Sequence, residues 1–114
     1  MIEGLWTAEF ASCANVYSGG VFIFQNGVIM GGDGGYFYFG DYCLNGNEFK
    51  AKLILRPFKK NCTSVFKTMN QDLMLDLAGS LKSDSLLIAK GHPREDTNLT
   101  CAIKFTKRPL EKLS

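Results

Sequence analysis

The feature that most constrains this chain is a period-two alternation of apolar and polar residues, repeated between closely spaced turn signals. In segment 49–56 the apolar side chains from Phe49 to Leu55 share one face, and lysine or arginine occupies most of the other. Segments 73–77 and 99–106 repeat the pattern, with Leu99 placed on the apolar face. Because successive side chains of a strand point to opposite faces, this pattern predicts strands with one face in a core and one in water. Such half-exposed strands are typical of antiparallel sheets.

Short turn signals separate these runs. Asn26-Gly27 is typical of a two-residue hairpin, and segments 45–47 and 82–84 predict two more tight links. The glycine-rich run 31–35 predicts a bulged or sharply coiled corner, and 91–96 a final loop. The signals together predict about eight strands, over residues 4–11, 17–25, 28–31, 35–42, 48–56, 72–79, 85–91 and 99–106.

The order and length of the links predict how these strands are arranged. The chain has 114 residues, 46% apolar and 21% charged, which is ordinary for a single globular domain over residues 1–114. Short links make neighbours in sequence neighbours in the sheet, and a meander of this size removes its exposed edges by closing. The predicted fold class is therefore all-β, a small antiparallel up-and-down β-barrel. A Greek-key sandwich would need more long crossovers than the one long link, 57–70.

That long link leaves two alternatives open. It is either a lid across an open end of the barrel or a surface loop whose Phe58, Val65 and Phe66 pack against the rim. The barrel interior leaves two alternatives as well, because eight strands enclose either packed side chains or one small ligand. The candidate walls of an apolar cavity are Trp6, Phe10, Phe49, Leu53, Leu75 and Ile103.

Two segments are apolar on both faces, which the outer wall of a barrel does not require. They are 21–24 and 36–39, and their pattern does not show which face is internal. An apolar outer face indicates that something covers it, and we expect a symmetric dimer, with the 57–70 link or the C-terminal tail as the alternative cover. The candidate dimer or partner interface comprises Phe22, Phe24, Tyr36, Phe37, Tyr38 and Phe39.

No motif predicts catalysis, and we expect a protein that is not an enzyme and has no cofactor or metal. The only histidine, His92, stands in the predicted last loop beside charged residues that point into solvent. The glycine run 31–35 precedes an aromatic strand rather than the helix that a phosphate-binding loop needs. Catalytic, metal-binding and cofactor-binding residues are therefore predicted to be absent.

The cysteines and the N-terminal segment predict the compartment. Cys13, Cys43, Cys62 and Cys101 lack the C-x2-C spacing of a zinc site, and we expect reduced, buried, unreactive thiols rather than two disulfides. Acidic residues stand in the first nine positions, where a secretory signal carries positive charge. A cytoplasmic protein without a membrane partner is therefore expected.

The net charge of +2 is too small for a chain whose affinity comes from neutralising phosphates, so no direct nucleic-acid partner is expected. The basic C-terminal end offers either a patch for an acidic partner or a solvated strand end. Its cationic residues are Lys104, Lys107, Arg108 and Lys112.

Several short motifs spread along the chain are similar to those of one family. They are Gly4-Leu5-Trp6, Gly19-Gly20-Val21-Phe22-Ile23 followed by Asn26-Gly27 and Gly31-Gly32-Asp33, and Asn98-Leu99-Thr100. On these motifs the chain resembles the GrlR-like negative regulators of bacterial type III secretion, small lipocalin-like β-barrel proteins.

The resemblance implies a cytoplasmic homodimer that represses by binding and sequestering a transcriptional activator. It also implies an apolar barrel cavity open to a lipid-like molecule, so a binding protein or sensor for such a ligand is the alternative function. One departure concerns the activator-binding surface. The founding member carries an acidic run between its fourth and fifth strands, whereas the corresponding segment here, 44–48, has Glu48 as its one acidic residue. That surface is therefore not carried over.

Overall fold

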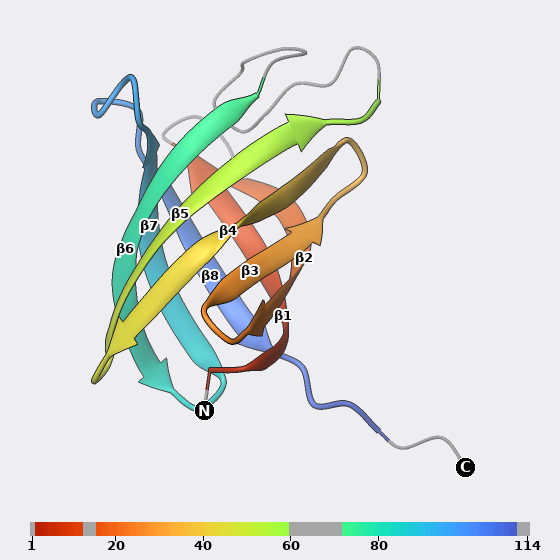
Figure 1. The fold of residues 1–114 in the computed structure, drawn as a ribbon, viewed down its shortest axis with the longest axis vertical. Helices are drawn as coiled ribbons and strands as arrows, with labels where there is room; N and C mark the ends of the chain where they lie inside the picture. Colours follow the sequence, from red (N-terminus) through yellow and green to blue (C-terminus); the bar gives the residue numbers. More distant parts are fainter. Residues whose placement is uncertain (1, 13–15, 60–71, 112–114) are drawn as a thin grey trace.

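The computed structural model describes residues 2–12, 16–59 and 72–111, which form a closed antiparallel barrel in which each strand pairs with the next (Figure 1). The strands are β1 Gly4–Ser12, β2 Val16–Gln25, β3 Val28–Gly32, β4 Tyr36–Asn45, β5 Glu48–Pro57, β6 Leu73–Ser83, β7 Leu86–Pro93 and β8 Cys101–Lys107. Pairing of β1 with β8, from Trp6 opposite Lys107 to Ser12 opposite Cys101, closes the ring. The predicted eight-strand up-and-down barrel is confirmed.

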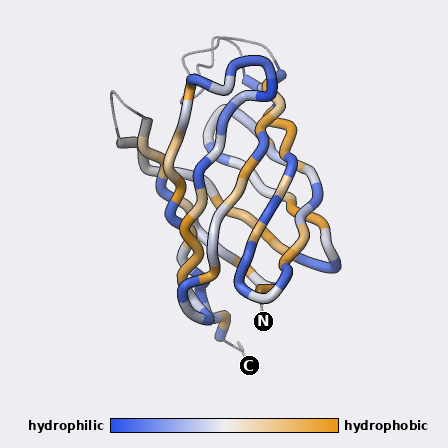
Figure 2. The backbone as a smooth tube through the Cα atoms, turned by 90° about the vertical axis from the view of Figure 1, so that its left-hand side faces the viewer, coloured by the Kyte–Doolittle hydropathy of each residue, from blue (hydrophilic) through white to orange (hydrophobic). Residues whose placement is uncertain are grey.

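The apolar residues of the alternating pattern lie inside the barrel, and the polar residues between them lie outside. Along β5 every second residue from Phe49 to Leu55 is buried, and Lys50, Lys52 and Arg56 are exposed. Figure 2 shows the same alternation of hydrophobic and hydrophilic residues along the strands. Closure leaves the backbone groups of the strands paired, so the ring has no open sheet edge between its first and last strands.

Two tight turns follow the predicted chemistry. In the β2–β3 hairpin both Asn26 and Gly27 have positive φ angles, 51° and 79°, as a type I′ turn requires. In the β3–β4 turn the Asp33 carboxylate accepts hydrogen bonds from the backbone N–H groups of Gly35 and Tyr36, both at 2.8 Å. The predicted corner at 31–35 is therefore a turn held by an aspartate side chain.

The segment between β7 and β8 differs from the prediction. Strand β7 extends to Pro93, so His92 belongs to a strand and is half-buried, not part of a loop. Strand β8 begins only at Cys101, and Leu99, predicted to point inward, is exposed. The physical reason is local turn formation, in which the N–H of Asp96 binds the carbonyl of Pro93 and the N–H of Leu99 binds the carbonyl of Asp96.

Aromatic rings fill the end of the barrel nearest the N-terminus, which we call the lower end (Figure 1). Phe24 lies at the centre, with ring centroids 5.6 Å from Trp6, 5.8 Å from Phe49 and 5.7 Å from Phe105. Ile2 is also buried there, and its carbonyl accepts a 2.7 Å hydrogen bond from the Trp6 indole N–H. The lower end is therefore packed with side chains.

Candidate functional site

The residues predicted to line an apolar cavity all lie inside the barrel. Trp6 and Phe49 are fully buried and belong to the aromatic packing of the lower end. The remaining candidates are also buried: Phe10, Leu53, Leu75 and Ile103. Their position on inner walls agrees with the sequence prediction, but whether a ligand binds between them stays a prediction.

The structure shows which residues of the aromatic segments 21–24 and 36–39 are internal and which are external. Their sequence pattern does not show this. Phe22, Phe24, Tyr36 and Tyr38 are buried within the barrel, so their prediction as interface residues is wrong for the free surface of this structure. They are internal because β2 and β4 bring their rings together, with Phe22 and Tyr38 stacked at 4.9 Å. Phe37 is exposed and Phe39 half-buried, so these two remain on the outer face.

An exposed apolar patch nevertheless covers the outer face of β2, β3 and β4. Its members are between 39% and 45% exposed, namely Val21, Ile23, Val28, Met30 and Phe37. The register places Met30 opposite both Ile23 on β2 and Phe39 on β4, so the apolar surface is continuous across the three strands. We call these five residues the β2–β4 patch.

The neighbouring outer face of β5 and β6 is charged, with cationic residues along 50–56 and acidic residues along 72–76. The outward residues of β5 include Lys50, Lys52 and Arg56, and those on or just before β6 include Asp72 and Asp76. Arg56 donates to Asp72 through Nη2 at 2.9 Å and lies over the ring of Phe39, 5.3 Å from its centroid. The hydrogen bond to Asp72 raises the pKa of the Arg56 guanidinium further above its ordinary value.

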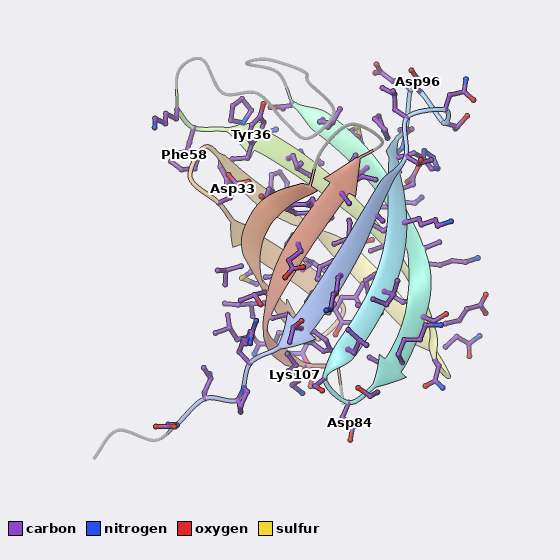
Figure 3. All side chains as sticks on the ribbon, turned by 180° about the vertical axis from the view of Figure 1, so that it is seen from behind. Asp33, Tyr36, Phe58, Asp84, Asp96 and Lys107 are labelled. Carbon is purple, nitrogen blue, oxygen red and sulfur yellow. The ribbon has the colours of Figure 1, made fainter. Side chains whose placement is uncertain are left out.

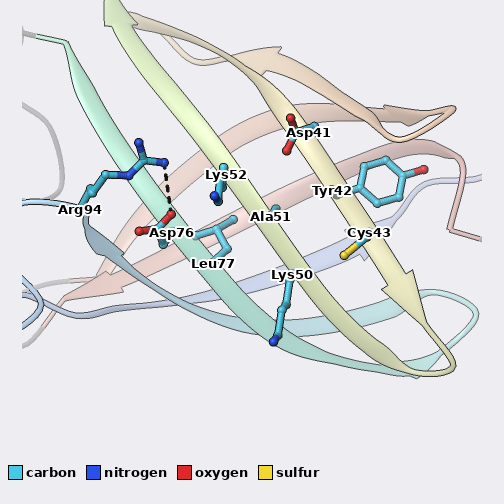
Figure 4. A pocket seen from close by; sticks show the side chains of 9 residues that line it. All are labelled: Asp41, Tyr42, Cys43, Lys50, Ala51, Lys52, Asp76, Leu77 and Arg94. Atoms are coloured by element: carbon cyan, nitrogen blue, oxygen red, sulfur yellow. Dashed lines mark ion pairs between the residues drawn. The ribbon is translucent and has the colours of Figure 1, made fainter.

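A shallow hollow of about 650 Å³ lies on this charged face. Its charged lining is Asp41, Lys50, Lys52, Asp76 and Arg94, which Figure 4 shows spread across β4, β5 and β6 and the end of β7. Register pairs Lys52 with both Asp41 and Asp76. The Nη2 atom of Arg94 lies 3.5 Å from Asp76 Oδ1, and Figure 4 marks this ion pair with a dashed line. Opposite charges therefore alternate across the hollow.

The Asp33 carboxylate joins the rim of the barrel to its interior. Besides its two backbone hydrogen bonds, it accepts a hydrogen bond from the buried Tyr38 hydroxyl. Burial, followed by the hydrogen bond and negative charge of Asp33, raises the pKa of the Tyr38 phenol well above its ordinary value. Figure 3 shows Asp33 and Tyr36 close together at the upper rim, the end away from the N-terminus. The arrangement fixes the β3–β4 turn to the inner wall.

The position of the histidine and of the possible metal ligands bears on the expected absence of catalytic and metal-binding residues. His92 Nδ1 lies 2.9 Å from the Pro93 carbonyl oxygen, and register places His92 beside Asp76. Among the residues that the structure describes, no group of three or more His, Cys, Asp or Glu side chains is arranged to hold a metal ion. The absence of enzymatic activity stays a prediction.

The cysteines only partly follow the prediction. Cys101 is buried, and burial raises the pKa of its thiol, whereas Cys43 is exposed because it stands on the outward side of β4. The prediction of buried thiols is therefore wrong for Cys43. Cys13 and Cys62 lie outside the described residues.

The predicted long link and the basic C-terminal end lie partly outside the described residues. Phe58 is exposed, while Val65, Phe66 and most of the 57–70 link lie outside the described residues. Of the basic C-terminal residues, Lys104 is exposed and Arg108 donates from Nε to the Thr7 hydroxyl at 2.9 Å. Lys107 lies over the Trp6 ring, 5.9 Å from its centroid, and Lys112 is outside the described range.

Comparison with known proteins adds no assignment. No protein-family model matches the chain, and no curated protein is significantly similar to it. The resemblance to GrlR-like regulators therefore stays a prediction. Within the described ranges no helix is long and apolar enough to cross a membrane.

Proposed function

We propose that this protein is a non-enzymatic regulator that binds and sequesters another protein. On the resemblance of its short motifs, we propose further that the target is a transcriptional activator of virulence or type III secretion genes, bound in the cytoplasm by a homodimer. The observation that carries the binding function is the β2–β4 patch.

Exposure of the β2–β4 patch to water is unfavourable in free energy, and this supports the proposed binding function. Each member is held on the outer wall by the period-two alternation of a closed barrel, so it has no route into the core. Contiguous exposed apolar residues beside polar ones are typical of protein-binding surfaces. Charged residues border this patch on β4 and β5, including Asp41 and Arg56. An apolar centre with a polar border favours recognition of another folded protein.

Substitution at the centre of the patch tests the proposal. Met30→Asp places a charge between Ile23 and Phe39 without altering the interior, since Met30 is exposed. We expect native mass spectrometry of the tagged protein, gently recovered from its host, to show a retained helix-turn-helix transcription factor. Met30→Asp should lose that factor, while Ala102→Asp, the same kind of change on an exposed position of β8, should keep it.

Two results would contradict the proposal. Wild-type protein that retains no protein partner would remove its basis, and equal retention by the wild type and Met30→Asp would show that the patch is not the binding surface. A barrel that carries only a lipid-sized adduct would favour the alternative function.

The alternative is a binding protein or sensor for a small apolar ligand. Its support is that the predicted walls, among them Phe10, Leu53 and Leu75, are buried on inner faces of the barrel. Because rings pack the lower end, a ligand would lie toward the upper end. Trp6 belongs to the packed lower end, so its fluorescence does not report directly on that upper site. Fatty acids that bind inside should be retained as adducts in native mass spectrometry, and the absence of an adduct across a broad panel of apolar probes would contradict the alternative.

A further inference from the structure

The outer face of β5 and β6 has a charge pattern that is complementary to itself. Three successive pairs of residues lie across this face, each with one residue on β5 and the other on or just before β6. The strand register defines two of these pairs and an ion pair defines the third, and we call each pair a row. Arg56 stands beside Asp72, Ile54 is paired with Met74, and Lys52 is paired with Asp76. The residue on β5 is cationic in the outer two rows and its neighbour is acidic, whereas the middle row is apolar. We call these six residues the β5–β6 face.

We infer that the β5–β6 face joins two copies of this chain around a twofold axis parallel to the strands and midway between β5 and β6. Such an axis lies in the interface and places β5 of each copy over β6 of the other. Lys52 then faces the partner's Asp76, and Arg56 faces the partner's Asp72. Ile54 and the partner's Met74 meet between these two charged rows.

Charge selects this arrangement over the alternatives. A twofold axis that runs across the strands through the middle row would instead set β5 on β5 and β6 on β6, which brings Lys52 onto the partner's Arg56 and Asp76 onto the partner's Asp72, like charges in both cases. The two charged rows, Lys52 with Asp76 and Arg56 with Asp72, thus remain complementary when the order of the strands is reversed.

The apolar row explains why a second copy would stay bound. Met74 is 41% exposed, although it stands in the centre of a charged surface. Ile54 is half-buried beside it, and Phe39 lies next in the same row, under the Arg56 guanidinium. Apolar side chains at the centre with ion pairs at the rim are the usual anatomy of an interface. The dimer therefore has both an apolar centre and a charged rim that fixes its orientation.

This inference rests on the homodimer of the proposed function and assigns its interface to a surface other than the β2–β4 patch. Figure 1 shows β2 and β3 on one side of the barrel and β6 on the other. The residues of the β2–β4 patch on β2 and β3 therefore lie away from the dimer axis, whereas Phe37 on β4 is paired with Arg56 at the border of the dimer face. This location differs from the one expected from the sequence, which placed the dimer on the aromatic strands.

Charge reversal on each half of one pair tests the twofold arrangement. In Lys52→Asp an aspartate faces the partner's Asp76, and in Asp76→Lys a lysine faces the partner's Lys52, so each variant alone sets like charges against each other twice. We expect analytical ultracentrifugation to show wild-type dimers and a dissociation constant raised by about tenfold or more in each variant. An equimolar mixture of the two variants should form heterodimers, because every facing pair is then opposite in sign.

The controls separate assembly from folding and from partner binding. Lys104→Asp makes the same charge change on an exposed position of β8, away from the face, and should dimerise like the wild type. Circular dichroism checks that each variant is folded. If either variant fails to fold, Arg56→Asp with Asp72→Arg supplies a second complementary pair on the same face.

The inference is overturned by a wild-type monomer at all accessible concentrations, by single variants that dimerise normally, or by a mixture that remains monomeric. None of these results bears on partner capture through Met30, so the dimer interface and the binding of a partner protein fail separately.

Discussion

At the scale of single residues, Asp33 organises more of the structure than its exposed position indicates. One of its oxygens accepts two backbone N–H groups of its own turn, and the other accepts the hydroxyl of Tyr38 from the barrel interior. An aspartate before glycines is a common turn residue, so its backbone contacts are predictable from sequence. The contact with Tyr38 is not, because it depends on which face of β4 is internal.

The raised pKa of Tyr38 has a consequence at alkaline pH. The ordinary phenol pKa is 10.0, so the unfolded chain loses this proton above that pH while the folded chain keeps it. The stability from the buried neutral phenol is therefore present below about pH 10 and is lost as the pH rises further. For this one group the free energy of unfolding should fall by about 1.4 kcal/mol per pH unit above pH 10.

Comparison with Tyr38→Phe isolates that effect. The variant should be less stable at neutral pH by about 1 kcal/mol, because it loses the hydrogen bond to Asp33. Its stability should then fall less steeply than that of the wild type between pH 10 and pH 11. Denaturant unfolding at a series of pH values measures both quantities, and parallel pH profiles for the two proteins would contradict the assignment.

At the scale of strands, β4 shows where sequence patterns succeed and where they fail. The pattern predicts β4 as a strand, and the hairpin signals on either side predict its neighbours. With aromatic residues at four consecutive positions, 36–39, alternation carries no information on which face is internal. The structure resolves this through packing, since Tyr36 and Tyr38 are buried while Phe37 is exposed.

The β5–β6 face illustrates a different limit of prediction. The cationic outer side of β5 and the acidic residues at 72 and 76 are both visible in the sequence. What the sequence does not supply is the register that aligns Lys52 with Asp76 and Ile54 with Met74. A long link separates the two strands in the sequence, so their register could not be read from a turn type.

Gly40 in β4 provides a prediction at the strand scale. A Cβ atom at this position would overlap the carbonyl oxygen of Lys52 on β5 and approach the Leu53 Cα atom to 3.0 Å. Gly40→Ala should therefore push the two strands apart and lower the free energy of unfolding by about 1–3 kcal/mol. Thermal or denaturant unfolding measures the loss.

Gly34 is the matched control for that substitution. It lies in the exposed β3–β4 turn, and a Cβ there would have no heavy atom within 4 Å. Gly34→Ala should change stability by less than about 0.5 kcal/mol. Equal effects of the two substitutions would show that close approach of β4 to β5 is not what requires glycine at position 40.

At the scale of the whole molecule, the barrel contains one continuous core. Buried residues from both ends of the chain, such as Trp6 and Phe105, belong to the same cluster. A single core in one small barrel favours cooperative unfolding. We expect Trp6 fluorescence and far-ultraviolet circular dichroism to report the same denaturant midpoint, and separate midpoints would indicate that the barrel unfolds in parts.

The pairing of β1 with β8 also affects how the protein folds. Ser12 is paired with Cys101 where β1 and β8 close the barrel. The hydrogen bonds that close the barrel therefore join two segments that are far apart in the sequence. Contacts of such long sequence separation slow folding, typically to milliseconds or seconds in all-β proteins. During synthesis β1 emerges before β8 and has one side without its final neighbour until the late strands follow. Until then an unpaired β1 edge is exposed to other nascent chains, and the cell must keep it from pairing with them.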